Sequence, residues 1–548
     1  MKTKGPAGQL SQPGGGTAAG TDGGTGDGAA DRTGPHVVIV GGGIAGLAAA
    51  FFLRDAPVRV TVLEGSPWLG GKLAVSEVAG VAVDAGAEAL LTRRPEGTDL
   101  IGGVGLGDQL VTPGTTSSAI WTRGAMRPLP QRQFMGVPAD LAPEGDLARS
   151  GVLSDGGLAR AREDLDRPAT PWDGDTAVAA YVGARFGAEV VDRLVDPLLG
   201  GVYAGRSEEL SFAATLGPLA KAAPAHRSLA EAAASLLPAP PEPQRPGQAA
   251  AAPPKRPPVF TTLAGGLGTL PAVLAETSGA VIRTRATVRE LARTATGWRL
   301  TVGSAAAPEE ITADAVVLAV PARPAGRLLA GVPGASLAAA ALSAIEYASM
   351  AIVTLAYPRS RFPAAQGTQG EQAGGEQARG GEARGGEAQR SGYLVPAVDG
   401  RAVKAVTFST VKWPHLADPG RGDHDGPVDL IRCSLGRIGE EGVLQRDDGE
   451  LVALAVADLA EATGAQGPPL DTRVTRWGGA LPQYTVGHLD RVAAIRAGVA
   501  AQPGLAVCGA AFDGIGIPAC IGTARSAAED TASYLRERYR PGGAPAGG

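Results

Sequence analysis

The sequence predicts an α/β fold whose main sheet is assembled from three separated parts of the chain. Residues 36–40 (HVVIV) and 58–64 (VRVTVLE) are apolar and β-branched, as strands are, and a helical pattern lies between them. Three more strand patterns lie between residues 281 and 321, and a strand pattern at 505–512 precedes a helical run at about 519–539. A β-α-β opening with further strands so far downstream indicates that distant segments pair in one sheet.

The first strand runs into a glycine-rich turn, V-I-V-G-G-G-I-A-G-L. Gly41, Gly43 and Gly46 form the pattern G-x-G-x-x-G between a strand and a helix. The first glycine permits a tight turn, the second lets a pyrophosphate approach the backbone, and the third lets the helix pack on the strand. The helix N-terminus then offers unpaired N–H groups and a positive dipole end to a phosphate. The chain therefore opens with a predicted Rossmann-like dinucleotide-binding domain.

The residues that follow favour FAD as the dinucleotide. Glu64 ends the second strand, where an acidic side chain accepts hydrogen bonds from a ribose and repels the 2′-phosphate of NADP. The string L-E-G-S-P-W-L-G-G-K then supplies a second glycine pair, Gly70 and Gly71, and D-A-G-A-E supplies Gly86, where the backbone can approach a flavin. The alternative is a glycine-rich hairpin in an NAD enzyme.

The C-terminal part of the chain indicates the second half of the same site. The string L-A-V-C-G-A-A-F-D-G-I-G-I-P-A-C reads as a strand, a loop at 514–517 and a helix with Pro518 in its first turn. A helix N-terminus aimed at the N1–C2=O edge of a flavin stabilises the negative charge of the reduced ring. We therefore predict that the two ends of the chain meet around one FAD.

Composition argues against several other classes of protein. The 548 residues carry 50 Lys+Arg against 55 Asp+Glu, and aromatic residues make up 4%, so there is no basic footprint for nucleic acid. Three scattered cysteines and five histidines without ligand spacing predict neither a disulfide framework nor a metal site. The absence of a signal-like segment and of a long apolar run predicts a cytoplasmic protein without a transmembrane helix, and leaves peripheral membrane contact open.

The chain is expected to alternate between segments of an FAD-binding domain and the substrate-binding and helical parts inserted between them. The FAD-binding domain is expected in three segments, with substrate-binding and helical parts inserted between them, and low-complexity stretches are expected to be disordered. The expected divisions are a disordered tail (1–33), the FAD-binding segments (34–110, 259–325 and 471–540), a substrate-binding and helical insertion (111–258, with a linker at 237–258) and a substrate-binding domain (326–470, with a disordered insertion at 364–391).

Several longer strings resemble the oxygen-dependent coproporphyrinogen III and protoporphyrinogen oxidases of haem biosynthesis, within the amine oxidase-like flavoprotein superfamily. The resemblance runs from about His36 to Arg538. The strings are R-P-L-P-Q-R-Q-F-M-G-V-P, L-V-D-P-L-L-G-G-V-Y-A-G, A-H-R-S-L, F-T-T-L-A-G-G-L-G-T-L, V-K-W-P-H and V-T-R-W-G-G-A-L-P-Q-Y-T-V-G-H. The last of these and the Asp-Pro…Tyr-Ala-Gly string are more specific than the glycine fingerprint.

The resemblance implies an FAD enzyme that oxidises coproporphyrinogen III to coproporphyrin III. Six electrons leave in three two-electron steps, and O2 accepts them as H2O2. Aromatisation drives such a reaction, so it needs little acid–base machinery, and no catalytic residue is assigned. The resemblance also implies a helical membrane-facing domain. It leaves open a transient contact with the downstream metal-inserting enzyme, and the oligomeric state is not indicated.

The resemblance also implies which residues hold the cofactor. The glycine-rich turn would bind the diphosphate, Glu64 the ribose, Val288 the adenine through its backbone, and Trp477 would lie beside the cofactor. The complete set is Gly41, Gly42, Gly43, Ile44, Ala45, Gly46, Glu64, Gly65, Gly71, Lys72, Gly86, Ala87, Glu88, Ala89, Val288, Trp477, Ile515, Gly516 and Ile517.

Five residues are predicted to contact the substrate. Arg94, and after it Arg132, are expected to grip a propionate, because a guanidinium binds a carboxylate at two points. The alternative for each is a solvated surface arginine. Met135, Tyr203 and Phe408 are expected to form apolar walls around the tetrapyrrole, and the alternative for each is an ordinary core position.

Three alternative functions stay open on the sequence. The first is oxidation of protoporphyrinogen IX in place of coproporphyrinogen III. The second is another flavin amine oxidase or desaturase, against which the lack of an aromatic cage argues. The third is a non-catalytic binding protein of the same fold, against which the intact Glu64 and the C-terminal Gly-Ile-Gly-Ile loop argue.

Overall fold

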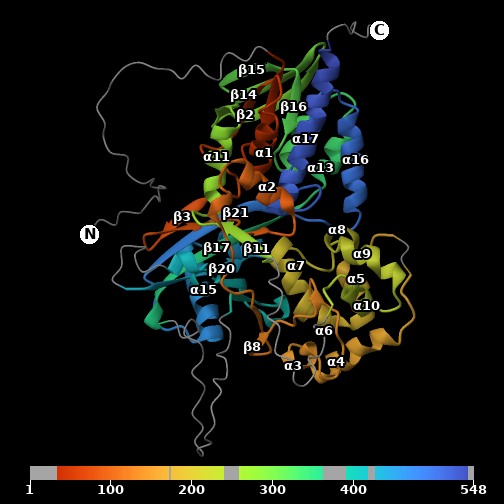
Figure 1. The fold of residues 1–548 in the computed structure, drawn as a ribbon, viewed down its shortest axis with the longest axis vertical. Coiled ribbons are helices and arrows are strands. Elements are labelled where there is room, and N and C mark those ends of the chain that lie inside the picture. Colours follow the sequence, from red (N-terminus) through yellow and green to blue (C-terminus); the bar gives the residue numbers. More distant parts are fainter. Residues whose placement is uncertain (1–33, 172–173, 240–257, 362–389, 418–425, 541–548) are drawn as a thin grey trace, which may run out of the picture.

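The computed structural model describes residues 34–171, 174–239, 258–361, 390–417 and 426–540. The tail predicted at 1–33 lies outside the described residues, as do most of the linker predicted at 237–258 and most of the insertion predicted at 364–391. Figure 1 shows one sheet with its helices at the top, a larger sheet below it and a group of short helices beside the larger sheet.

The upper sheet has five strands, and all four of its strand pairs are parallel. It confirms the predicted α/β fold, because it joins strands from the start, the middle and the end of the chain. In spatial order the strands are β12 (Val281–Arg283), β2 (Arg59–Leu63), β1 (His36–Val40), β16 (Ala315–Leu318) and β22 (Leu505–Val507).

Both faces of this sheet are covered, which explains why β1 is an unbroken apolar run. Val37 and Ile39 pack into one hydrophobic cluster, and Val38 and Val40 pack into another on the opposite face. The first cluster lies under α1 (Ile44–Phe52), α2 (Pro95–Gly103), α11 (Leu270–Thr277) and α17 (Ile517–Arg538). The second lies under β13 (Val288–Thr294), β14 (Gly297–Ser304), β15 (Ala307–Ala313), α12 (Ala322–Ala330), α13 (Ser336–Ser343) and α16 (His488–Ala500).

The lower sheet has seven strands, and all its pairs except β18–β7 are antiparallel. One face packs on α15 (Asp448–Thr463) through Leu451, Ala455 and Leu459. In order the strands are β21 (Asp471–Pro482), β17 (Tyr347–Pro358), β20 (Val428–Leu435), β19 (Val403–Phe408), β18 (Gly392–Leu394), β7 (Ala119–Thr122) and β8 (Ala125–Pro128).

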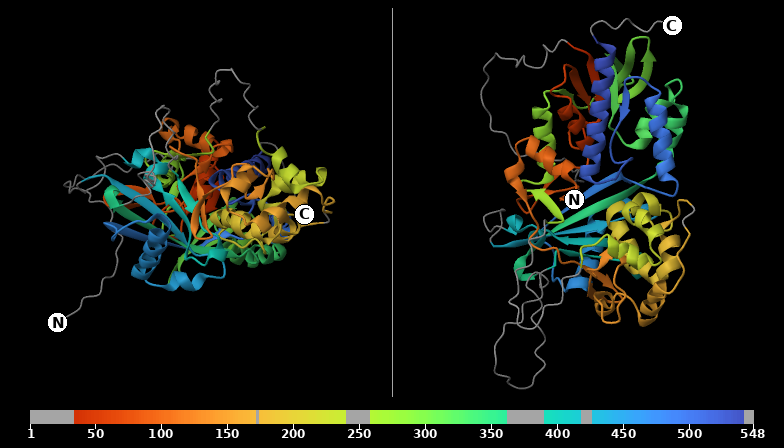
Figure 2. Two further views of the ribbon diagram at one scale, coloured as in Figure 1. Left: turned by 90° about the horizontal axis from the view of Figure 1, so that it is seen from below. Right: turned by 45° about the vertical axis from the view of Figure 1, so that its right-hand side comes forward.

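A group of short helices packs around its own hydrophobic cluster beside the lower sheet (Figure 2). Its centre includes a buried ion pair in which Arg185 Nε donates to Asp164. Among the described residues, no helix combines the length and the apolar character needed to cross a membrane. The helices are α3 (Asp146–Ser150), α4 (Asp155–Arg162), α5 (Val178–Phe186), α6 (Ala188–Val190), α7 (Asp196–Tyr203), α8 (Phe212–Thr215), α9 (Gly217–Ala222) and α10 (Leu229–Ser235).

Short elements connect the two sheets and shape the space between them. The most important are the hairpin of β3 (Val75–Val78) and β4 (Val81–Asp84), and the single turn η5 (Leu267–Thr269). The others are β5 (Leu90–Leu91), β6 (Leu110–Val111), β11 (Phe260–Leu263) and α14 (Ser409–Lys412), whereas β9 (Gln133–Phe134) and β10 (Val137–Pro138) pair with each other beside α10.

Candidate cofactor and substrate site

A cavity of about 1350 Å³ lies between the two sheets. Its upper wall is made by residues that follow the carboxyl ends of β1, β2, β16 and β22, the edge at which open parallel sheets bind their ligands. Its lower wall is one face of β17, β19, β20 and β21. Pockets for a single drug-sized ligand measure roughly 300–1,000 Å³, so the cavity has room for a dinucleotide and a second molecule.

The glycine-rich turn places an open helix end in this cavity. Gly43 is the N-cap of α1, and no side chain caps the helix there. A Cβ at Gly43 would meet nothing within 4 Å, whereas one at Gly46 would lie 1.9 Å from the carbonyl oxygen of Gly41. Gly41 has φ +111°, which favours glycine. The three glycines therefore provide the turn, the close packing and the open approach that a diphosphate needs.

Glu64 is held in place by two backbone amides. The amides of Gly42 and Ser66 each donate to a separate oxygen of its carboxylate, both at 2.7 Å. Glu64 and Gly65 line the cavity beside Val288 and Arg289 of β13. A carboxylate oxygen can accept more than one hydrogen bond, so this group is fixed and still able to receive ribose hydroxyls.

A second open helix end comes from the C-terminal part of the chain. Gly516 is the N-cap of α17, and no side chain caps this helix either. The preceding loop is fixed by Tyr484, whose hydroxyl accepts from the amide of Gly514 at 2.8 Å and donates to the carbonyl of Ala510 at 2.7 Å. Two positive helix ends thus face one cavity, an arrangement that suits the diphosphate and the reduced flavin of FAD.

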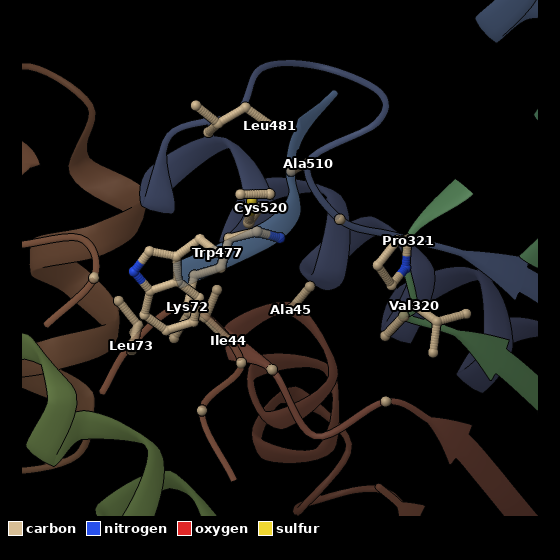
Figure 3. Close-up of a pocket in the computed structure, with 18 of the residues that line it drawn as sticks. Ile44, Ala45, Lys72, Leu73, Val320, Pro321, Trp477, Leu481, Ala510 and Cys520 are labelled. Carbon is tan, nitrogen blue, oxygen red and sulfur yellow. The ribbon is translucent and has the colours of Figure 1, made fainter. Parts of the chain in front are cut away.

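The second glycine pair ties the cavity wall to the first turn. Gly70 donates to the carbonyl of Gly42 at 2.8 Å and forms a β-bridge with Gly43. Figure 3 shows Lys72 extending beside the ring of Trp477 toward Ala45 and Cys520. These residues come from widely separated parts of the chain. Burial lowers the pKa of Lys72.

The segment around Gly86 forms the wall between Lys72 and the lower sheet. A Cβ on Gly86 would lie 2.0 Å from the carbonyl oxygen of Lys72, so glycine is required for this close approach. Trp477 Nε1 donates to the carbonyl of Ala85 at 3.0 Å, and Arg432 Nη2 donates to that of Gly86 at 2.6 Å. The backbone at Ala85 and Gly86 is thus fixed in position at the edge of the cavity.

A charged cluster fixes the same segment. Lys412 Nζ lies 2.6 Å from Glu88, and Arg432 Nη1 donates to the other oxygen of that carboxylate. Burial opposes ionisation of Glu88, but the two cations outweigh it and lower its pKa to about 2. The carboxylate is therefore ionised, and it neutralises cations that would otherwise be buried alone.

The structure brings most of the predicted cofactor residues together. Gly42, Gly46 and Gly516 lie next to lining residues in the chain but do not line the cavity themselves. The predicted residues that line it are Gly41, Gly43, Ile44, Ala45, Glu64, Gly65, Gly71, Lys72, Gly86, Ala87, Glu88, Ala89, Val288, Trp477, Ile515 and Ile517.

The residues predicted to bind substrate do not line this cavity. Arg94 is paired at 2.8 Å with Glu96, and Arg132 Nη1 donates at 2.8 Å to the carbonyl of Pro238. Both guanidinium groups are thus engaged elsewhere on the protein.

The three predicted apolar walls are packed into the surrounding clusters. Met135 packs against the helical cluster, and Tyr203 is buried in it with its ring 5.5 Å from that of Tyr484. Phe408 packs on the α15 side of the lower sheet beside Tyr393. In these packed positions the three side chains serve the core, and their contact with substrate stays a prediction.

The lower wall contains residues that the sequence did not indicate. Met350 and Ile352 of β17 and Ala405 and Thr407 of β19 face the cavity, with Ser434 of β20 between them. The strand patterns singled out in the sequence do not include β17, β19 or β20, and nothing local indicates which face of these strands meets the cofactor. The small side chains of Ala405 and Ser434 leave room for a broad ligand at the middle of this face.

Three comparisons place the chain among known proteins. The family model for flavin-containing amine oxidoreductases matches residues 44–532. The coproporphyrinogen III oxidase of Mycobacterium tuberculosis is 38% identical, over 89% of this chain and 95% of that protein. The enzyme of the same name from Bacillus subtilis is 30% identical, over 91% and 98%.

Solved structures share the fold. A structure from Exiguobacterium sp. 255-15 has a TM-score of 0.73 at 28% identity and covers 91% of this chain and 99% of that one. Cyclohexylamine oxidase from Brevibacterium oxydans has a TM-score of 0.60 at 15% identity, over 92% and 100% of the two chains. At that identity the second likeness concerns the fold alone.

Proposed function

Because the chain belongs to the flavin-containing amine oxidoreductases, and among them to the coproporphyrinogen III oxidases, we propose that it oxidises coproporphyrinogen III to coproporphyrin III in haem biosynthesis. FAD is its cofactor and O2 its electron acceptor. Each turnover removes six electrons and releases three molecules of H2O2.

One observation carries this proposal: two uncapped helix N-termini face a single cavity that is larger than a dinucleotide pocket needs to be. FAD, when bound, supplies the two-electron acceptor chemistry. The amides at the start of α1 would hold its diphosphate, and Glu64 would hold its ribose. The start of α17 would meet the negative charge that develops on reduction.

The lower wall would position the tetrapyrrole. Met350 and Ile352 offer it an apolar surface, and Ala405 and Ser434 keep the space above the strands open. Trp477, hydrogen-bonded to Ala85, closes the wall next to the cofactor. These residues orient the macrocycle and exclude bulk water, which is the main requirement of a reaction driven by aromatisation.

The test is anaerobic mixing of the FAD-loaded protein with coproporphyrinogen III while the flavin absorbance is followed. We expect the flavin band to bleach and to return when O2 is admitted, with coproporphyrin III appearing. Protoporphyrinogen IX under the same conditions is the control and should react more slowly. Faster reaction with protoporphyrinogen IX would change the proposed substrate, and no bleaching with either would reject the function.

The product sets a further expectation about partners. A free porphyrin must next receive a metal ion, so we infer transient contact with a metal-inserting enzyme. Peripheral contact with a membrane surface is a separate proposal, which rests on the membrane-facing helical domain that the resemblance implies. Cross-linking of the two purified enzymes during turnover tests the first contact. Flotation with lipid vesicles tests the second, and recovery of all the protein in the unbound fraction would contradict it.

A further inference from the structure

A second, much smaller pocket lies directly behind the wall of the main cavity. It has a volume of about 30 Å³ and is lined by residues of β4, β11, α14 and β20 and of the turn after α14. Glu88 and Arg432 line both spaces, so they form the partition between them. A single water molecule needs roughly 10–15 Å³ of such space, so the small pocket can hold one or two water molecules.

Several residues that line this pocket carry unpartnered polar atoms. Among the described residues, four lining residues each have one buried side-chain atom without a hydrogen-bond partner: Thr262 Oγ1, Ser409 Oγ, Trp413 Nε1 and Arg432 Nε. A buried polar group left unpaired costs about 1–3 kcal/mol, and a buried water is stable where two to four such groups surround it. Two of these atoms are N–H donors and two are hydroxyls, so together they can satisfy a water completely.

Asp84 supplies an acceptor and a titrating group to the same pocket. Its two oxygens accept from the amides of Leu267 at 3.0 Å and Gly268 at 2.8 Å. Burial raises the pKa of Asp84 to about 6, and Glu88 adds to this effect, while the two amides and Arg432 oppose it. His415 lines the pocket as well, and Lys412, whose ammonium lies 5.2 Å from the ring centre of Trp413, pairs with Glu88.

We propose that this pocket binds one or two ordered water molecules, and that Asp84 exchanges a proton with the main cavity through them. The water would accept from Trp413 Nε1 and Arg432 Nε and donate to the carboxylate of Asp84. Its route to the main cavity passes the Glu88–Arg432 partition. The site of proton storage is thus separated from the reacting ligands by a single layer of side chains.

The proton transfer rests on the proposed function, whereas the binding of water does not. Each two-electron oxidation removes a hydride equivalent from a methylene bridge and releases one proton from the ring system, and tautomerisation brings the remaining hydrogens to the positions they have in the porphyrin. Reduction of O2 to H2O2 later takes up that hydride equivalent and one proton. Asp84 would hold the proton between the two events, so no additional oxidant or base is needed.

A crystal structure of the FAD-loaded protein tests the binding of water. We expect density for at least one water within hydrogen-bond distance of Trp413 Nε1 and Arg432 Nε, with a second bond to Asp84. A pocket closed by rearranged side chains, or one without such density at high resolution, would overturn the proposal. This measurement is independent of any substrate.

Stopped-flow bleaching of the flavin, followed between about pH 5 and 8, tests the proton transfer. An ionised Asp84 can accept a proton and a protonated one cannot, so the wild-type rate should fall as the pH falls through about 6. In Asp84→Asn this acid limb should vanish, and bleaching above the limb should be about tenfold slower. Trp413→Phe should also slow bleaching but keep the limb. Glu77→Gln, an exposed carboxylate on the same hairpin, should resemble wild type.

The outcomes separate the two proposals. If wild type is not bleached by any porphyrinogen, the proposed function fails, and the crystal structure alone decides about the water. If wild type is bleached but Asp84→Asn and Trp413→Phe retain its rates and its acid limb, the proton transfer is wrong. Asparagine offers a single oxygen to two amides, so if Asp84→Asn does not fold, a rate for Trp413→Phe equal to wild type still rejects the proposal.

Discussion

At the scale of single residues, glycines of one short motif have different roles. Gly46 lets α1 approach the strand before it, because any side chain there would meet the carbonyl of Gly41 at 1.9 Å. Gly43 faces open space in the cavity and has the extended conformation that other residues also adopt. Gly46 therefore serves packing, and Gly43 serves the approach of a ligand.

These two glycines make a matched pair for mutation. Gly46→Ala should destabilise the protein by several kcal/mol, because a backbone contact of this kind cannot relax without moving the helix. Gly43→Ala should leave the melting temperature of the cofactor-free protein nearly unchanged and weaken FAD binding about tenfold or more. Thermal unfolding and fluorescence titration with FAD measure the two effects. Equal loss of stability in both variants would contradict the assignment.

Mutation of Glu64 tests the predicted contact with the ribose of FAD. Glu64→Ala removes a carboxylate that is already fixed by the amides of Gly42 and Ser66, and charge-assisted hydrogen bonds of this type contribute about 1.5–3 kcal/mol. We expect FAD affinity to fall by about tenfold to a hundredfold. Glu77→Ala, on an exposed position of β3, is the control. Unchanged retention of FAD on gel filtration would remove Glu64 from the site.

At the scale of secondary structure, the helices that face the cavity contrast with one that faces away. The N-terminus of α15 has a complete capping box, in which Asp447 and Glu450 satisfy each other's backbone amides. The N-termini of α1 and α17 have glycine at the N-cap and no acidic residue in the first turn. Other helices, such as α16, also lack a side-chain cap, so what distinguishes α1 and α17 is that their uncapped N-termini lie at the cavity.

Capping α17 should therefore stabilise the helix and impair the site. In Gly516→Asp the new side chain fits without a close contact and can accept from the first-turn amides. Because glycine is itself a tolerated N-cap, we expect the cofactor-free protein to gain only about a few tenths of a kcal/mol in its free energy of unfolding, while FAD affinity falls. Asp447→Ala in α15 should do the reverse, losing stability without changing affinity. Unaltered FAD binding by Gly516→Asp would mean that α17 does not face the cofactor.

At the scale of the whole molecule, one charged cluster joins the segment after β4 to the lower sheet. Glu88 lies between Lys412 and Arg432, and Arg432 also holds the carbonyl of Gly86. The two walls of the cavity are thus connected through residues more than 300 positions apart in the chain. Breaking a buried pair of this kind leaves a charge without a partner, which is strongly destabilising.

The cluster predicts a specific sensitivity to acid. The pKa of Glu88 in the folded protein, about 2, lies below its ordinary value of 4.5, so the stability that it contributes is complete above about pH 4.5 and is lost as the pH falls toward 2. The free energy of unfolding of wild type should fall more steeply over this range than that of Glu88→Gln. At neutral pH the variant should be the less stable of the two. Parallel curves from urea unfolding at several pH values would refute this role.

The sequence by itself determined the local requirements of the site. The glycines at 41, 43, 46 and 86 and the acid at 64 were readable because a tight turn, a close approach and a strand-end carboxylate each depend on a few consecutive residues and on fixed spacing. The strand patterns likewise predicted one sheet assembled from distant segments of the chain.

Only the tertiary structure decided which distant side chains meet. Arg432 belongs to an unremarkable strand pattern, and its contact with Glu88 follows from the register of the lower sheet and the path of the chain between the two sheets. The same holds for the pocket shared by Asp84, Trp413 and Arg432. Arg94 and Arg132 fit the chemistry of a propionate, and the structure adds their contacts with Glu96 and Pro238, while their contact with substrate stays a prediction. Contacts of this kind depend on the relative placement of packed elements, and no short stretch of sequence encodes that placement.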